Sequence, residues 1–323
     1  MIFSLALALC GLVRSEPLWP APSQATFREA TRLCSQGRYS QADALSQQLA
    51  GEERDLLHAV VGLSRFEDLH DPQTLRTVKA QLESAIGKLD DDTPRERFWL
   101  ALALVQKSVV AGKLGENLSA AWSGRKAAAL CQKLRDQGYQ SPDIDGILGG
   151  YLFWKAQSLG AARHLFGGDT RARGIALTEA AAKSQSPLRD AYRSSLAWMR
   201  FEQGRYAEGL AICRTALEEF PENRIWRQAE GDMLFRLGRR EEALSVYRRS
   251  WNEYAGVETI PVNRLSAAGN LGRIHLAMGN DDSARHWIQV FDDPRYRAAR
   301  PWLPASLVRE IAPVRRRLGL PSP

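Results

Sequence analysis

Apolar residues recur three and four positions apart along most of the 323-residue chain, and strict alternation of apolar and polar residues is nearly absent. Ala, Leu, Arg, Glu and Gln fill most of these segments, whereas runs of β-branched residues are rare. This spacing and composition are typical of amphipathic helices. The sequence therefore predicts an all-α protein.

Breaks in the pattern predict four helices in the middle of the chain. The breaks combine Asp, Gly and Pro, which begin or end helices, at 91–94, 112–115 and 138–142. The expected helices are 71–89, 94–112, 116–137 and 142–158. The run from Phe98 to Val105 is apolar, but Arg97 and Lys107 bound it. It is far too short to span a membrane, so we expect a fully buried helix.

A short motif recurs at four places in the chain. Each copy starts with Gly and has a small residue at its end, at 37–42, 204–209, 238–243 and 279–284. Gly204 and Gly238 are 34 residues apart, and Gly238 and Gly279 are 41 apart, with the extra residues absorbed near Gly256 and Pro261. Gly ends a helix in a left-handed turn, and a small residue lets the next helix approach closely. The motif therefore predicts helical hairpins.

These segments resemble tetratricopeptide (TPR) repeats, which are helix–turn–helix units of 34 residues. The matching positions are Leu196, Ala197, Phe201, Gly204, Tyr206, Ala216 and Pro221, then Gly231, Leu234, Gly238, Ala243 and Tyr247, then Leu271, Gly272, Gly279 and Ala284. Gly209 stands where the family usually has Ala, and the large residue expected early in each unit is missing. Because no single unit buries its own apolar stripe, the units must stack. The resemblance implies an α-solenoid.

The resemblance also implies a binding groove, because the first helix of each TPR unit lines the concave face of the solenoid. The groove-facing candidates for partner binding are Trp198, Phe201, Asp232, Phe235, Arg236 and Arg273. Aromatic and Arg side chains dominate recognition energetics, although the aromatic residues can instead pack between repeats. Family members that clamp a terminal carboxylate use Lys and Asn at positions held here by Ser194 and Trp198. That chaperone-type recognition is not expected.

The net charge of +7 is concentrated at the C-terminus. Residues 295–323 hold seven Arg and one acid, Glu310, so they contribute +6; Arg14 adds +1 and the rest of the chain is neutral. An apolar stripe predicts a final helix at 303–318, with Arg309, Arg315, Arg316 and Arg317 opposite the stripe. We expect this basic helix to cap the solenoid, and docking on an anionic surface is the alternative.

The N-terminal pattern predicts a signal peptide at residues 1–15. An apolar run ends at Val13, and Val13 and Ser15 occupy the −3 and −1 positions for cleavage before Glu16. The run lacks a preceding Lys or Arg. The expected location is the periplasm or the exterior. A misassigned start or a buried first helix is the alternative, and the protein is then cytoplasmic.

Cofactor and catalytic motifs are absent from the sequence. After signal removal Cys34, Cys131 and Cys213 remain, with no CxxC spacing, and the five His residues are scattered. There is no GxSxG motif, P-loop or dinucleotide-binding motif. We expect no cofactor, no metal and no enzymatic activity, although a solenoid can assemble a catalytic pair that spacing does not reveal.

The predicted organisation is a signal peptide at 1–15, degenerate TPR-like hairpins at 16–187, three TPR repeats at 188–291 and a basic capping helix within 292–323. The predicted function is a non-enzymatic scaffold of the bacterial envelope that binds a peptide or protein in its groove. The alternative is a cytoplasmic regulatory TPR protein whose Arg-rich helix contacts nucleic acid or lipid. The neutral body disfavours nucleic acid as a partner.

Overall fold

The computed structural model describes residues 17–165 and 168–320, and the predicted signal peptide lies outside them. Within these ranges every regular element is a helix. The α-helices are α1 (Ala21–Ser35), α2 (Tyr39–Ala44), α3 (Gly51–Leu69), α4 (Pro72–Lys88), α5 (Pro94–Lys113), α6 (Asn117–Asp136), α7 (Pro142–Leu159), α8 (Arg171–Ala182), α9 (Arg189–Glu202), α10 (Tyr206–Glu219), α11 (Arg224–Arg236), α12 (Arg240–Glu253), α13 (Val262–Ala277), α14 (Asp281–Asp292) and α15 (Ala305–Arg317). The all-α prediction is confirmed.

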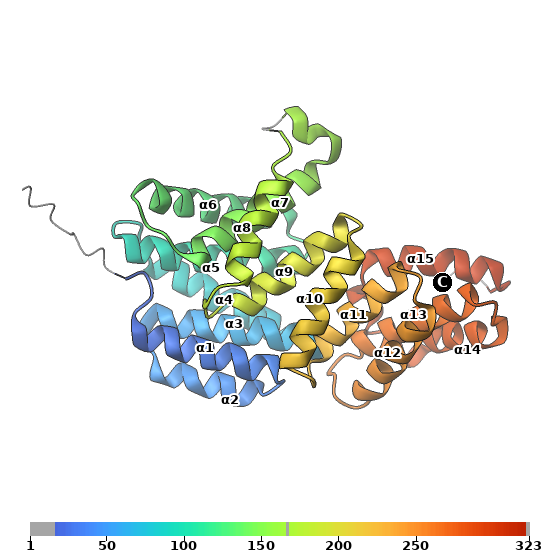
Figure 1. Cartoon of the computed structure of the whole chain (residues 1–323). Helices are drawn as coiled ribbons and strands as arrows, with labels where there is room; N and C mark the ends of the chain where they lie inside the picture. The colour runs from blue at the N-terminus through green and yellow to red at the C-terminus, as the bar shows by residue number, and fades with distance from the viewer. Residues whose placement is uncertain (1–16, 166–167, 321–323) are drawn as a thin grey trace, which may run out of the picture.

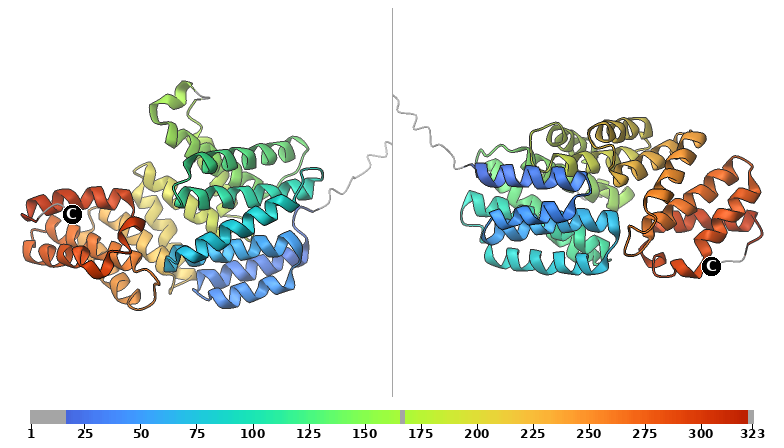
Figure 2. Two further views of the ribbon diagram at one scale, coloured as in Figure 1. Left: turned by 180° about the vertical axis from the view of Figure 1, so that it is seen from behind. Right: turned by 90° about the horizontal axis from the view of Figure 1, so that it is seen from below.

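Helices α1 to α14 pack mainly on the helix that precedes or follows them, so the chain forms hairpins that stack in sequence order, and α15 packs back on α13 (Figure 1). Figure 2 shows the first and last helices at opposite ends of the molecule, with α9 to α12 between them. The architecture is the predicted α-solenoid. Short 3₁₀ helices at Leu45–Gln48, Gly160–Leu165, Pro294–Tyr296 and Arg300–Trp302 complete the described chain.

The motif glycines end the first helix of their hairpins, as predicted. Gly37, Gly204, Gly238 and Gly279 all have positive φ, between +73° and +80°. An added Cβ would meet nothing within 4 Å at any of them, so glycine is required there by the left-handed backbone and not by space. After Gly238, the amide of Arg239 donates to the carbonyl of Leu234 at 3.0 Å, the bond that closes a Schellman turn.

Gly209, the departure from the usual Ala, is explained by the next repeat. A Cβ at Gly209 would lie 2.6 Å from Sδ of Met233, which belongs to α11. Met233 is fully buried and fills the space that an Ala methyl group would occupy. The substitution of Ala by Gly therefore accommodates a larger side chain in the neighbouring unit.

The middle helices α4 to α7 lie over the four predicted ranges. The apolar run of α5 is buried on every side, and Trp99 is 1% exposed. Within the described residues no helix is both long enough and apolar enough to cross a bilayer. The prediction of a buried helix holds for Phe98 to Leu104, and Val105 is half-buried.

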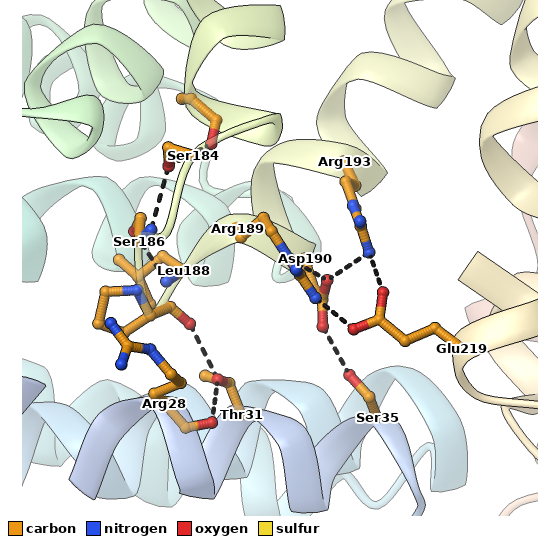
Figure 3. Close-up of polar contacts among 12 residues, drawn as sticks. Arg28, Thr31, Ser35, Ser184, Ser186, Leu188, Arg189, Asp190, Arg193 and Glu219 are labelled. Carbon is orange, nitrogen blue, oxygen red and sulfur yellow. Dashed lines mark hydrogen bonds and ion pairs between the residues drawn. The ribbon is translucent and has the colours of Figure 1, made fainter. Parts of the chain in front are cut away.

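The first hairpin lies beside the linker between α8 and α9, which is remote from it in sequence (Figure 3). The hydroxyl of Thr31 donates to the carbonyl of Pro187 at 2.9 Å, and that of Ser35 donates to Asp190 at 3.2 Å. Arg193 joins Asp190 to Glu219 of α10 through ion pairs of 3.2 and 2.6 Å. The N-terminal helices are thus held against the repeats by polar bonds between distant segments.

The last helix, α15, packs its apolar stripe on α13. It begins at Ala305 because a 3₁₀ turn and Pro304 precede it, two residues later than the predicted start. The Cδ1 of Ile311 lies 2.6 Å from the position that a Cβ on Gly269 would take. The prediction that Arg315 faces solvent is wrong: Arg315 is 5% exposed and pairs with Asp292. It lies four positions after Ile311, on the same face of the helix.

Candidate partner-binding site

Two arginines from consecutive repeats converge on one carboxylate. Arg236 ends α11 and Arg273 lies in α13, and both form ion pairs with Glu310 of α15, Arg236 at 2.5 Å. The Arg273 guanidinium also donates to Oδ1 of Asn270 at 2.7 Å. Burial lowers the pKa of Arg273, and the charge of Glu310 opposes that shift. The two guanidinium groups thus form a carboxylate-binding site, which Glu310 of the same chain occupies.

Aromatic rings lie under both guanidinium groups. The Arg273 guanidinium lies 4.4 Å from the centre of the Phe235 ring, and that of Arg236 lies 5.5 Å from the centre of the Phe201 ring. Trp198 contacts Phe201 edge-on, with 5.4 Å between ring centres. Cation–π contact orients each guanidinium and raises the cost of moving it. The structure thus links five predicted groove residues in one cluster.

Asp232 of α11 lies near the same two arginines, on the buried side of the cluster. Its Oδ1 accepts a hydrogen bond of 2.6 Å from the hydroxyl of Tyr247 on α12. Burial raises the pKa of Asp232, while this hydrogen bond and the charges of Arg273 and Arg236 oppose the rise. Asp232 therefore holds the two repeat helices together and supplies negative charge beneath the arginines. We call Trp198, Phe201, Asp232, Phe235, Arg236 and Arg273 the groove cluster.

Helix α15 covers the face of α13 that was predicted to line the groove. Gly269 contacts Ile311, as described above, and Leu276 is buried in the same apolar cluster as Leu307 and Ile311. Along α9 and α11, by contrast, Trp198 and Phe201 are only half-buried and Arg236 is exposed. Among the cluster residues, Trp198, Phe201 and Arg236, on α9 and α11, therefore remain accessible.

Glu310 is the functional residue that the sequence reasoning did not select. It was visible only as the single acid in the Arg-rich segment 295–323. An isolated acid in such a segment is a signal for an internal ion pair, but its partners belong to two other helices. No spacing rule connects position 310 with positions 236 and 273.

A polar hollow lies where the N-terminal helices meet α11. Its volume is about 180 Å³, and its lining includes Ser35, Tyr39, Asp68, Asn223 and Arg224. Asp68 accepts hydrogen bonds from the Tyr39 hydroxyl at 2.9 Å and from Nε of Arg224 at 2.9 Å. Because these groups already satisfy one another, we interpret the hollow as a structural junction.

The described residues contain no group of His, Cys, Asp and Glu side chains that could hold a metal ion. Cys34, Cys131 and Cys213 are buried and unpaired. Burial raises the pKa of the Cys34 and Cys213 thiols to about 12, so neither is a thiolate near neutral pH. The three residues occupy core positions.

Comparison with solved structures defines the class of fold. No family model and no curated protein matches the sequence. The Rap protein complexed with Competence and Sporulation Factor has a TM-score of 0.53 at 12% identity, covering 92% of this chain and 82% of Rap. A tetratricopeptide repeat protein from Parabacteroides merdae has a TM-score of 0.42 at 14% identity, covering 91% of this chain and 99% of that one.

NprR in complex with its cognate peptide NprX has a TM-score of 0.45 at 12% identity, covering 93% of this chain and 85% of NprR. At these identities a likeness shows the fold and not the ligand. The chain has the fold of a TPR-like α-solenoid, in agreement with the resemblance seen in its repeats.

Proposed function

We propose that this protein is a non-enzymatic interaction scaffold that binds an acidic segment of a peptide or protein partner in the groove beside α9 and α11. The observation that supports the proposal is the convergence of Arg236 and Arg273 on Glu310. Arg236 donates to Glu310 through Nη2, and a carboxylate of the partner suits the same guanidinium at its exposed edge. Arg236 is at that edge, because its side chain remains 35% exposed.

The aromatic residues supply the apolar part of the proposed recognition. Trp198 and Phe201 are half-buried, so part of each side chain remains accessible while the edge-on contact between the two rings fixes their positions. Rigid aromatic anchors next to an oriented Arg are the side chains that contribute most to binding energy in protein interfaces. A partner with an acidic residue next to an apolar one fits both elements.

Solved structures support the proposal at the level of fold. The Rap structure, whose fold is similar, holds the Competence and Sporulation Factor. A solenoid leaves one continuous face of stacked helices for a ligand, since each repeat contacts only its neighbours. The groove cluster gives this chain a specific chemistry on that face.

The groove assignment is tested by affinity capture from the source cells. We expect the wild-type protein to retain a partner that Trp198→Ala/Arg236→Ala loses. Arg240→Ala is the matched control, because Arg240 is exposed at the start of α12 and does not belong to the cluster. Identical partner sets for wild type and the double variant would sink the assignment. Circular dichroism of each variant shows whether the solenoid is retained.

We also propose that the protein acts in the bacterial envelope, on the basis of the apolar segment that ends at Val13. N-terminal sequencing of the protein purified from its own cells, together with fractionation, tests this part separately. A mature chain that begins at Glu16 in the periplasmic or extracellular fraction is the expected result. An intact N-terminus in the cytoplasmic fraction would contradict it and leave the groove proposal standing.

A further inference from the structure

A hollow on the surface of α6, α7 and α8 combines apolar atoms with cations. Its volume is about 260 Å³. Residues of all three helices line it, including Arg125, Ala129, Tyr151, Leu152, Arg173 and Leu177. Helix α7 packs directly on both α6 and α8. Helices α6, α7 and α8 all precede α9 in the chain and contribute no residue to the groove cluster (Figure 1).

The apolar surface of the hollow continues along α6. Leu118, Trp122, Arg125 and Ala129 follow one another at intervals of four, three and four positions, so they share one face of the helix. The first two are strongly exposed: Leu118 is 89% exposed and Trp122 is 61% exposed. Trp154 of α7 is a further exposed aromatic residue, at 38%. Single exposed apolar residues are ordinary, but a row that leads into a hollow indicates an interaction surface.

Three cations lie beside these apolar groups and form no ion pair with any described residue. Arg125 and Arg173 line the hollow, and the Lys126 ammonium lies 5.4 Å from the centre of the Trp122 ring. In the part of the chain that the structure describes, none of these three side chains forms an ion pair. On the same helix α6, by contrast, Lys133 pairs with Asp91 and Arg135 pairs with Asp145.

Cations beside an apolar surface favour a partner that carries both acidic and apolar side chains. Acidic side chains would find uncompensated guanidinium groups at Arg125 and Arg173, and apolar side chains would remove Trp122 from water. The apolar atoms of Leu152 and Leu177 lie within a hollow, where single side chains can enter. A bilayer surface is less suited to recessed atoms than an amphipathic peptide with protruding anchors.

We propose that the surface formed by Leu118, Trp122, Arg125, Tyr151, Arg173 and Leu177 binds an acidic amphipathic segment of a partner protein. A large apolar side chain of that segment enters the hollow, and acidic residues beside it pair with Arg125 and Arg173. Trp122 covers the segment from the α6 side. The site is separate from the groove beside α9 and α11, so the two proposals succeed or fail independently.

The experiment measures fluorescence anisotropy of a labelled helical peptide of about 18 residues, roughly 27 Å long, titrated with the full-length protein. The probe carries Glu on one face and Leu with a central Phe on the other. We expect binding that Arg125→Glu/Arg173→Glu weakens at least about tenfold, with a similar loss for Trp122→Ala. A peptide with Lys in place of Glu should bind at least about tenfold more weakly than the probe to the wild-type protein.

Arg309→Glu/Arg316→Glu is the matched control. These two arginines are exposed on α15, and replacing them changes the net charge by the same amount outside the proposed site. This control variant should bind the probe as the wild type does. No binding of the probe by the wild type, equal binding of the Lys peptide, or unchanged binding by Arg125→Glu/Arg173→Glu each overturns the proposal. Thermal melting followed by circular dichroism verifies that every variant is folded.

Two further measurements separate the peptide from other occupants. Co-sedimentation with vesicles of phosphatidylglycerol and phosphatidylcholine should be absent or unaffected by Trp122→Ala. Loss of vesicle binding in that variant would instead make this a lipid-binding surface and overturn the proposal. Self-association in sedimentation velocity that Arg125→Glu/Arg173→Glu abolishes would make the occupant a second copy and overturn it as well.

Discussion

Arg224 at the start of α11 donates from Nε to Asp68 at the end of α3, 156 positions earlier in the chain, at 2.9 Å. Asp68 is 2% exposed and also accepts from the hydroxyls of Tyr39 and Tyr254. One buried carboxylate thus connects the N-terminal helices with the start of α11 and the end of α12. The N-terminal helices are part of the same folded unit as the repeats.

Removing the cation of this pair should be costly. We expect Arg224→Ala to lower the free energy of unfolding by about 3 kcal/mol, because it leaves the Asp68 charge buried without its ion pair. Urea denaturation of both proteins measures the difference. Arg240→Ala, at an exposed position, should change stability by less than about 0.5 kcal/mol. An equally small effect of Arg224→Ala would show that the two tyrosines alone satisfy Asp68.

The junction also predicts a pH dependence of stability. Burial raises the pKa of Glu258 to about 8, while the backbone amides of Arg264 and Asn263 oppose the rise. Between its ordinary value of 4.5 and about 8, the folded chain holds a proton at Glu258 that the unfolded chain lacks. The free energy of unfolding contributed by this group therefore falls as pH rises through that window.

His70 acts in the opposite direction at lower pH. Burial lowers the pKa of His70 from 6.5 to about 4, so its contribution to stability is complete above pH 6.5 and is lost as pH falls toward 4. The decline expected from Glu258 therefore extends above pH 6.5, where the contribution of His70 no longer changes. Urea titrations between pH 6.5 and about 8 should show a decline for wild type and a smaller decline for Glu258→Gln. Parallel slopes would contradict the assignment.

Gly149 and Gly174 bring the backbones of α7 and α8 into contact. A Cβ on Gly149 would lie 2.6 Å from the carbonyl oxygen of Gly174, and one on Gly174 would lie 2.7 Å from that of Gly149. Backbone atoms cannot rotate away, so Gly149→Ala should destabilise the fold by about 2 kcal/mol.

The neighbouring position supplies the control for this prediction. A Cβ on Gly150 meets nothing within 4 Å, so Gly150→Ala should stabilise the helix by about 0.5–1 kcal/mol. Thermal or urea unfolding of the two variants measures the expected loss of stability for Gly149→Ala and the expected gain for Gly150→Ala. Destabilisation of similar size in both would mean that helix packing at Gly149 is not the cause.

Glu310→Gln tests whether the α15 carboxylate supports the C-terminal repeats. Arg273 is only 10% exposed at its side chain and would lose its ionic partner. We expect a loss of about 2 kcal/mol in the free energy of unfolding. Arg309→Gln, one position earlier and exposed, should be neutral. If the two variants unfold alike, the contact of Glu310 with Arg273 contributes little, and the other contacts of α15 hold it in place.

The three described cysteines should resist thiol reagents in the native state. Cys131 is fully buried and burial raises the pKa of its thiol, as it does for Cys34 and Cys213. Site-resolved mass spectrometry after alkylation should find these three unmodified, and modified once urea is added. Rapid native modification of any of them would reveal local opening of its helix pair.

The repeat glycines and helix ranges were predictable because their causes are local. A left-handed turn at Gly204 or Gly238 needs only the residue itself, and a run such as Pro94–Lys113 carries its own start and stop signals. The groove cluster was partly predictable, since the 34-residue period places Phe201 and Phe235 at equivalent positions of successive repeats. The pairing of Arg236 and Arg273 with Glu310 was not.

The pattern along the chain was sufficient for the all-α class, the hairpin turns and the concentration of charge near the C-terminus. It did not show which charged side chains form ion pairs within the fold. Arg315 is buried against Asp292, whereas Arg125 and Arg173 remain without ion pairs among the described residues. The difference arises because helix packing, and not sequence spacing, decides which distant carboxylate lies within reach of each guanidinium.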